Sequence, residues 1–294
     1  MANQAAEKTV GFRALAAVLV PFLSSIARIQ FTDPQKLPKT GAFVLSPNHY
    51  SNIDPVIMGW SIWKLGRAPR FLAKASLFRV PVVGAVLRGT GQIPVERAGS
   101  VRGSEPLKAA NELVEKGNAV IIYPEGTLTR DPQIWPMKGK TGAVRMALEQ
   151  NLPLIPAAHW GTQAVMARYS NKISLFPRKT IKVAFGDPVD LADFRGKPIN
   201  AAMLTAATEL VMADITALLE GLRGEAAPVE RWNPAAHNAS SGAHGIPQAL
   251  PGSKMGPGWE SDPNVQINWG LQYIAGVYGT PCEAWASSEN RGWY

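Results

Sequence analysis

Residues 42–65 read AFVLSPNHYSNIDPVIMGWSIWKL, and this stretch decides the fold class. Its start, Ala42–Ser46, is almost wholly apolar and is bounded by proline, which predicts a buried strand. Asp54 followed by Pro55 predicts an N-cap with proline at the first helical position, so we expect a helix over Pro55–Leu65. A strand that leads through a short loop into a helix is the unit from which α/β folds are built.

The same alternation continues over the first 230 residues. Helices are predicted at Glu105–Lys116, Thr141–Gln150 and Ala201–Leu222. Further strands are predicted at Arg70–Ala73, Gly91–Glu96, Ala119–Tyr123, Leu154–Ala158 and Ile181–Phe185. We therefore predict an α/β fold with a mixed, largely parallel sheet flanked by helices.

Composition excludes several classes of protein. Of the 294 residues, 46% are hydrophobic and 18% are charged, which is too apolar for a disordered chain. A single cysteine, Cys282, excludes an internal disulfide, and with only four histidines beside it there is no zinc-finger-like cluster. We predict neither a metal nor a cofactor.

The net charge of +8 indicates an anionic partner, which could be nucleic acid, a lipid surface or a phosphorylated substrate. Residues 231–294 hold three basic and four acidic residues, a net −1, so the first 230 residues carry +9. The basic residues are scattered, with no aromatic-interleaved stretch, which speaks against nucleic acid.

The N-terminal residues 1–30 contain an apolar run, Ala14–Ala27, between Arg13 and Arg28. As a helix it would be about 21 Å long, which is short of the roughly 30 Å of a bilayer core. The start of the chain is polar, and no secretory signal peptide is predicted. We expect a helix that lies in the membrane interface with Lys8 and the two arginines beside it; a helix buried against the domain is the alternative.

His49 and Asp54 are the first candidate functional pair. They lie in the loop before the predicted helix, where a carboxylate can fix the tautomer of an imidazole and stabilise the imidazolium. Such a histidine can act as general base on an alcohol. In the alternative interpretation Asp54 only caps the helix and His49 is a solvated loop residue.

A second candidate group follows the strand Ala119–Tyr123, which runs into the turn Pro124–Thr127. Gly126 permits a turn that presents backbone amides outward, and Glu125 places a carboxyl group at the end of the strand. Basic residues that could converge on a phosphate are Arg97, Arg130, Lys138 and Lys140. Taken one by one, each is equally well explained as a solvated surface charge.

These pieces, in this order, resemble the glycerolipid acyltransferase family of lysophosphatidate (PlsC-type) acyltransferases. The resemblance covers roughly residues 10–230. It rests on matches to NHxSxxD at Asn48, His49, Ser51 and Asp54, to PEGT at Pro124, Glu125, Gly126 and Thr127, and on the blocks GQIPVER (91–97) and Leu154–Pro156. Leu128 departs from the family, which often has arginine there, and this leaves Arg130 as the nearest substitute.

The resemblance implies a reaction. His49 would deprotonate the free hydroxyl of 1-acyl-sn-glycerol 3-phosphate with support from Asp54, and the alkoxide would attack the thioester of acyl-CoA or acyl carrier protein to give phosphatidic acid. Amides near Gly126 would stabilise the oxyanion. The implied substrate-binding residues are Arg97, Glu125, Gly126, Thr127, Arg130 and Lys138. Leu77–Leu87 would line an acyl-chain groove or, alternatively, be plain core.

Two further alternatives stay open. The acceptor could be glycerol 3-phosphate or another lysophospholipid, or the chain could be a non-catalytic lipid- or cell-wall-binding fusion. The location that the resemblance implies is the cytoplasmic face of the plasma membrane, as a peripheral or monotopic protein on an anionic surface.

The composition changes after GLRGEAAPV (221–229). Residues 231–294 hold five of the nine tryptophans and a Gly-, Pro- and Ser-rich stretch, Ser240–Asp262. This Trp- and Gly-rich extension resembles the C-terminal part of actinobacterial lysozyme-like transglycosylase domains, with Glu230 at the place of the catalytic glutamate. The serine that should follow Glu230 and the upstream helix are missing, so we expect no catalysis here. The predicted domains are residues 1–30, 31–230 and 231–294.

Overall fold

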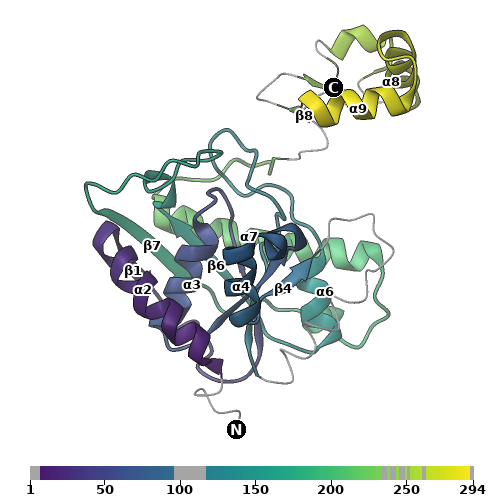
Figure 1. The fold of residues 1–294 in the computed structure, drawn as a ribbon. Helices are drawn as coiled ribbons and strands as arrows, with labels where there is room; N and C mark the ends of the chain where they lie inside the picture. Colours follow the sequence, from purple (N-terminus) through teal and green to yellow (C-terminus); the bar gives the residue numbers. More distant parts are fainter. Residues whose placement is uncertain are drawn as a thin grey trace. The chain divides into compact units, whose positions relative to one another are not determined.

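The computed structural model describes residues 7–95, 117–232, 237–238, 243–244, 249, 252–259 and 263–291. The chain forms two compact units, drawn in Figure 1. The first consists of Met1–Thr129 with Ile134–Glu230, and the second of Arg130–Gln133 with Arg231–Tyr294. Each unit is described by itself.

A seven-stranded sheet in the order β1-β7-β6-β2-β5-β3-β4 forms the centre of the first unit. Every neighbouring pair is parallel except β6 and β7, which are antiparallel. The predicted mixed, largely parallel sheet is thus confirmed. The strands are β1 (Ala27–Thr32), β2 (Phe43–Pro47), β3 (Pro69–Lys74), β4 (Ile93–Val95), β5 (Ala119–Ile121), β6 (Leu154–Trp160) and β7 (Lys179–Phe185).

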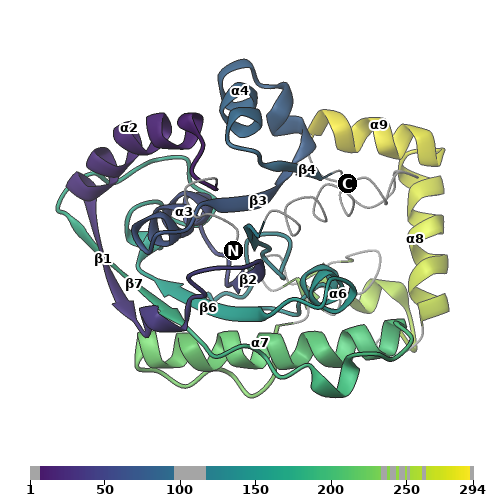
Figure 2. The same cartoon turned by 90° about the horizontal axis from the view of Figure 1, so that it is seen from below.

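Helices cover both faces of this sheet. Figure 2 shows α2, α3 and α4 on one side and α7 along the other, with α6 beside it. The α-helices of this unit are α2 (Val10–Ile26), α3 (Asp54–Lys64), α4 (Pro81–Gly89), α6 (Gly142–Glu149) and α7 (Ala201–Arg223). Short 3₁₀ helices are η1 (Pro34–Lys36), η2 (Ala75–Arg79), η3 (Thr162–Ala164) and η4 (Ala192–Phe194).

Strand β2 shows why the core has two layers. All five of its residues are buried. Successive side chains of a strand point to opposite faces, so Phe43 and Leu45 join the core cluster that contains α3, while Val44 joins the cluster that contains α6 and α7. A strand buried on both faces reads as a continuous apolar run, which is the pattern that predicted it.

Helix α7 is the one described helix that is long and apolar enough to cross a membrane by length and composition. It is better explained as a core helix, because Leu204, Val211, Ile215 and Leu219 are among eight side chains that it buries. Its ends follow capping rules: the Asn200 side chain accepts a hydrogen bond at the start, and the helix ends at a left-handed glycine.

Two elements were not predicted as such. Strand β1 begins at Ala27, inside the run expected to be helical, and its alternating burial places it at the edge of the sheet. Helix α4 occupies most of Leu77–Leu87, and Gly84 is its one buried residue, so the plain-core alternative for this segment is wrong. The helix predicted at Glu105–Lys116 and the strand end at Glu96 lie outside the described residues.

Helix α2 combines both alternatives weighed for the N-terminal segment. Leu23 and Ile26 are buried against the sheet, whereas Val10 and Val18 are 84% and 71% exposed. The helix therefore packs on the domain with one face and leaves apolar side chains of another face uncovered. Its role at a membrane interface stays a prediction.

A buried ion pair fastens the beginning of the chain to the first unit. The Arg67 guanidinium is fully buried and donates to both carboxylate oxygens of Glu7, at 2.8 to 3.2 Å. It also donates to the carbonyl oxygens of Pro38, Gly41 and Gly117. A fully paired guanidinium of this kind is tolerated in a core, whereas removing one partner would leave an uncompensated charge.

The second unit contains α8 (Pro263–Val277), α9 (Pro281–Arg291), the 3₁₀ helix η5 (Gly252–Met255) and the two-stranded ladder of β8 (His237–Asn238) with β9 (Ala243–His244). On α8 the rings of Trp269 and Tyr273 stack with centroids 5.2 Å apart.

Candidate active site

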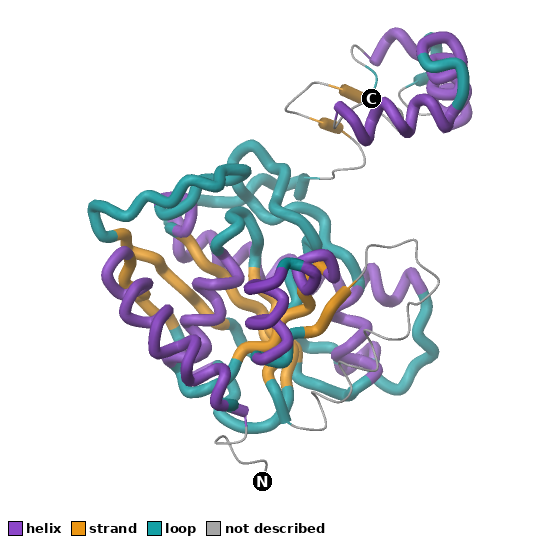
Figure 3. Tube along the Cα trace, viewed as in Figure 1, coloured by secondary structure: helices purple, strands orange, loops and turns teal. Residues whose placement is uncertain are grey.

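Three loops of the first unit meet at one edge of the sheet. Strands β2, β5 and β6 are parallel neighbours, so the segments that follow them leave at the same edge. Figure 3 shows long loops gathered at this end of the molecule. The loop after β2 carries His49 and Asp54, the one after β5 carries Glu125, and the one after β6 carries Thr162.

The Asp54 carboxylate is fully buried and faces back into the loop that precedes it. Its Oδ2 accepts hydrogen bonds from the amides of Tyr50 and Ser51, both at 2.7 Å. The predicted helix cap is therefore wrong in detail: α3 starts at Asp54 itself, Ile53 occupies the N-cap position, and no side chain caps the helix. The carboxylate instead fixes the shape of the loop that holds the histidine.

His49 is paired with this carboxylate. Its Nδ1 lies 3.0 Å from Asp54 Oδ2, and its side chain is 16% exposed. A hydrogen on Nδ1 that is donated to the carboxylate leaves Nε2 as the nitrogen that can accept a proton. The Tyr123 ring packs against the imidazole with centroids 4.2 Å apart, which restricts its rotation.

The second oxygen of Asp54 accepts a hydrogen bond of 2.6 Å from the Thr162 hydroxyl. Burial by itself raises the pKa of Asp54, but the neighbouring histidines and this hydroxyl outweigh it and lower the pKa below its usual value. The carboxylate therefore stays ionised at neutral pH. Thr162 was not predicted as a site residue.

A second histidine, His159 at the end of β6, was also missed by sequence reasoning. It is fully buried, with Nε2 3.8 Å from Asp54 Oδ2 and 2.9 Å from the Asn48 carbonyl oxygen. Its backbone exchanges two further hydrogen bonds with the Asn48 side chain. Burial lowers the pKa of His159, so its ring is neutral and ties the catalytic loop to the sheet.

Glu125 joins the loop after β5 to the catalytic loop. Its carboxyl oxygens accept hydrogen bonds from the backbone amides of His49, at 2.9 Å, and of Met137, at 3.1 Å. It is 1% exposed, and burial raises its pKa to about 8 although these amides oppose the shift. Glu125 was predicted to bind substrate, but this geometry favours a role in shaping the pocket.

Gly126 and Thr127 form the exposed tip of the next turn. Gly126 has φ +69°, a left-handed conformation, and its amide donates to the Tyr123 carbonyl to close the turn. That amide is thus engaged and is not an oxyanion donor here. The Lys140 side chain lies directly over Gly126, within about 3 Å of where a Cβ would be.

The predicted basic residues are brought together only in part. Lys138 is exposed and follows Met137, whose amide bonds to Glu125. Arg130 is exposed but belongs to the second compact unit, so the structure does not place it at the site. Arg97 lies outside the described residues.

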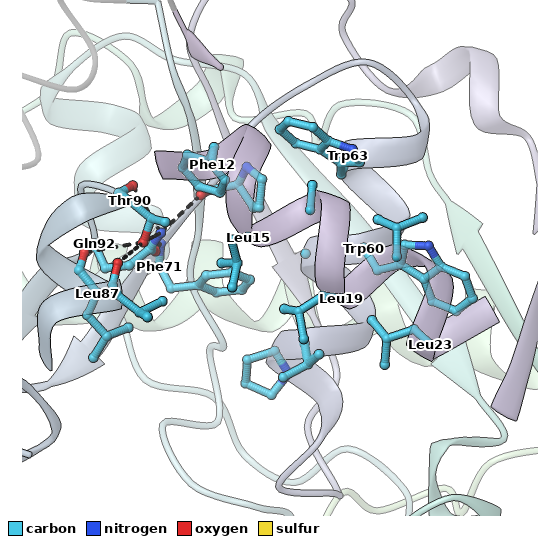
Figure 4. A pocket seen from close by; sticks show the side chains of 17 residues that line it. Phe12, Leu15, Leu19, Leu23, Trp60, Trp63, Phe71, Leu87, Thr90 and Gln92 are labelled. Carbon is cyan, nitrogen blue, oxygen red and sulfur yellow. Dashed lines mark hydrogen bonds between the residues drawn. The ribbon is translucent and has the colours of Figure 1, made fainter. Parts of the chain in front are cut away.

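An apolar groove opens beside the start of α3 (Figure 4). Its volume is about 270 Å³, and it is bounded by α2, α3, β3 and α4. Pro55 and Val56, the two residues after Asp54, form part of its wall, so it begins next to the catalytic loop. Of the expected acyl-groove segment, Val86 and Leu87 line it, while Val82 points to solvent with 76% exposure.

A family model described as Acyltransferase matches residues 28–160 of the chain. This stretch includes the His49–Asp54 pair, Glu125 and His159, which together form the buried hydrogen-bond network. The chain is thus similar to the acyltransferase family over residues 28–160. This match agrees with the resemblance predicted from the two motifs.

Curated relatives agree with this assignment. The chain is 29% identical over 198 residues to a 1-acyl-sn-glycerol-3-phosphate acyltransferase of Bacillus subtilis, which covers 67% of this chain and 92% of that protein. It is 32% identical over 126 residues to the chloroplastic 1-acyl-sn-glycerol-3-phosphate acyltransferase BAT2 of Brassica napus. The latter match spans 43% of this chain and only 35% of the Brassica protein.

Among solved structures, the 1-acyl-sn-glycerophosphate acyltransferase PlsC of Thermotoga maritima shares the fold, with a TM-score of 0.50 at 20% identity. The superposition covers 76% of this chain and 81% of that one. None of these matches supports the lysozyme-like resemblance of residues 231–294.

Proposed function

We propose that the protein is a 1-acyl-sn-glycerol-3-phosphate acyltransferase, which moves a fatty acyl group from a thioester to the free hydroxyl of lysophosphatidate and forms phosphatidic acid. The observation that carries the proposal is the pairing of His49 Nδ1 with a buried, ionised carboxylate, which leaves Nε2 as a base. The names of the Bacillus and Brassica relatives supply the acceptor.

In the reaction, His49 Nε2 takes the proton of the acceptor hydroxyl as the oxygen attacks the thioester carbonyl carbon. The imidazolium that forms is stabilised by the Asp54 carboxylate. Collapse of the tetrahedral intermediate breaks the carbon–sulfur bond, and the proton on Nε2 passes to the leaving thiolate. We expect the oxyanion donors among the amides that follow Gly126 in the exposed turn.

The same proposal assigns the substrate contacts. Lys138 and Lys140 are the cations of the turn after β5 that can meet the acceptor phosphate, and Lys140 covers the glycine of that turn. Arg97 and Arg130 stay predictions for the same role. The apolar groove beside α3 is the place for an acyl chain, because it starts at the catalytic loop and is lined almost entirely by carbon.

Location and tail complete the proposal. We place the protein at the cytoplasmic face of the plasma membrane as a peripheral protein, supported by the exposed apolar side chains of α2 and the basic residues near them. The tail is proposed to be an incomplete lysozyme-like segment without catalytic power. Glycerol 3-phosphate and other lysophospholipids remain alternative acceptors, and acyl-CoA and acyl carrier protein are both possible donors.

The deciding measurement is thiol release from palmitoyl-CoA by the full chain, with and without lysophosphatidate, beside His49→Ala. We expect acceptor-dependent release that the variant loses without a change in its far-UV circular dichroism. His244→Ala, in the second unit, is the matched histidine control and should keep full activity. Acceptor-dependent release by His49→Ala at the rate of the unchanged protein would contradict the proposal.

Two companion assays separate the alternatives. Replacing lysophosphatidate with glycerol 3-phosphate tests the other acceptor, and a higher kcat/KM with it would change the acceptor while keeping the reaction type. Glu230→Gln tests the tail: acyl transfer should be unaffected, because Glu230 is exposed and belongs to the lysozyme-like resemblance alone.

A further inference from the structure

Eight consecutive residues, Asn171–Arg178, are exposed in the loop that leads into β7. Three of them are apolar: Ile173, Leu175 and Phe176 are 45%, 41% and 76% exposed. Isolated exposed apolar residues need no explanation, but three within four positions of one loop form a patch that water does not favour. We call these residues the 171–178 loop.

The charged residues near this patch in the sequence have a single sign. No aspartate or glutamate occurs between Gln150 and Gly186, whereas the same stretch contains the five cations Arg168, Lys172, Arg178, Lys179 and Lys182. Lys172 and Arg178 belong to the 171–178 loop itself and are exposed beside its apolar side chains. Apolar side chains whose charged sequence neighbours are all cations complement a surface that offers hydrocarbon beneath a layer of negative charge.

The loop lies beside the exposed helix α2. Arg178 Nε donates to the carbonyl oxygen of Ala27, the residue at which α2 passes into β1, at 3.3 Å. Figures 1 and 2 both show the loop before β7 next to this end of α2. On the last turns of α2, Val18 and Phe22 are 71% and 46% exposed, so apolar side chains of the two segments lie on neighbouring parts of the surface.

The residues just before the 171–178 loop are bonded to the catalytic loop. The Ser51 hydroxyl donates to the Met166 carbonyl at 2.7 Å, and the Asn52 side chain reaches the Ser170 carbonyl at 3.5 Å. The Ser174 amide donates to the carbonyl of Val165, which folds the segment back on itself. A surface that binds through the 171–178 loop therefore comes within a few residues of the histidine loop.

We propose that the 171–178 loop is a membrane-contact element in addition to α2, with Leu175 and Phe176 entering the acyl layer of an anionic bilayer and Lys172 meeting its headgroup phosphates. The inference rests on the proposed function in that it takes the lipid that the enzyme acylates to reside in that bilayer. A bilayer explains the loop better than an acidic protein does, because three apolar side chains are exposed on it beside cations, and a bilayer offers both hydrocarbon and negative charge.

The test is co-sedimentation of the full chain with vesicles of phosphatidylcholine alone, or of equal parts of phosphatidylcholine and phosphatidylglycerol. The double variant Leu175→Ser/Phe176→Ser should weaken partitioning onto the mixed vesicles by about tenfold or more, as the loss of two buried apolar side chains implies. Lys172→Gln should weaken it by about fivefold on the mixed vesicles and leave the phosphatidylcholine vesicles unaffected.

Leu210→Ser is the matched control, because Leu210 is 44% exposed on α7, on the opposite face of the sheet. It should bind vesicles as the unchanged protein does. Unchanged partitioning of the double variant would overturn the inference. Unchanged partitioning together with a loss of activity only when acyl carrier protein is the donor would also overturn it. That result would assign the loop to contact with an acidic protein.

Failure of the proposed function gives a different pattern. A chain that binds mixed vesicles through this loop but transfers no acyl group to lysophosphatidate would retain the inference and contradict the function. An active enzyme whose double variant keeps both its vesicle binding and its activity on vesicle-borne lysophosphatidate would support the function and contradict the inference.

Discussion

The catalytic loop and the 171–178 loop differ in almost every physical respect. In the catalytic loop, residues 48–54, the Asp54 carboxylate accepts from two amides, a hydroxyl and the His49 ring, and the side chains of Asn48 and Ser51 are buried. In the 171–178 loop all eight residues are exposed. Chemistry needs a preorganised polar network, whereas contact with a soft surface needs exposed side chains, and this molecule places the two next to each other.

The largest expected effect comes from breaking the network at its centre. Asp54→Asn should lower kcat on the order of a thousandfold or more, because an amide group favours the wrong imidazole tautomer and cannot support the imidazolium. Steady-state thiol release measures it. Asp187→Asn, at an exposed carboxylate that pairs with Lys36 at 2.9 Å, is the matched control and should be near full activity. Equal kcat in the two variants would refute the assigned role.

The next effect concerns the attachment of the catalytic loop to β6. His159→Phe removes the ring hydrogen bond to the Asn48 carbonyl. A displaced catalytic loop should lower kcat by roughly tenfold to a hundredfold, and the unpaired carbonyl should lower the free energy of unfolding by about 1–3 kcal/mol. His159→Gln retains a donor and should recover part of both. If the phenylalanine variant kept its kcat while losing stability, His159 would have a purely structural role.

Glu125 makes the stability of the first unit depend on pH. Its pKa is about 8 in the folded protein and 4.5 in the unfolded chain, so above pH 4.5 the folded state holds a proton that the unfolded state has lost. The free energy of unfolding should therefore fall as pH rises from about 4.5 to 8, by at most about 1.4 kcal/mol per pH unit from this group. Urea unfolding across this range should show a shallower slope for Glu125→Gln, and an identical slope would exclude Glu125 as the cause.

The smallest effect compares the two loops by removing one hydroxyl group from each. Ser51→Ala removes the hydrogen bond to the Met166 carbonyl and should lower the free energy of unfolding by about 1 kcal/mol. Ser174→Ala, at an exposed serine of the 171–178 loop, should change it by a few tenths at most. Both are measured by urea unfolding, and equal losses would mean that the Ser51 hydrogen bond adds no more to stability than an exposed hydroxyl does.

Local patterns were sufficient for much of the fold. The apolar runs that became β2 and β6, and the helical periodicity of α3 and α7, are signals contained within each segment. Strand β1 was missed because its burial is only alternate and it directly follows an apolar helix, so the run Ala14–Ala27 has no internal mark of the boundary. Helix α4 was missed because its apolar side chains face a groove and solvent instead of a core.

The candidate site divides in the same way. The contact of His49 with Asp54 was expected because they are five positions apart in the sequence. His159 and Thr162 come to the same carboxylate from the end of β6, more than a hundred residues later, and only the pairing of β2 with β6 brings them there. The inward direction of Glu125 was equally hidden, because it depends on how the turn after β5 packs on the catalytic loop.

The Arg67–Glu7 pair has a consequence for the apolar groove. Helix α2 forms one wall of the groove. Glu7, just before that helix, is paired with the Arg67 guanidinium, which also donates hydrogen bonds to three backbone carbonyls from separate segments. If α2 moved outward, the buried charge would become exposed or lose its partner. The distance between α2 and α3 is therefore expected to stay constant. Selectivity among acyl chains would then depend on the fixed width of the groove. An acyl chain too thick or too kinked for that width would be excluded without any conformational change of the protein.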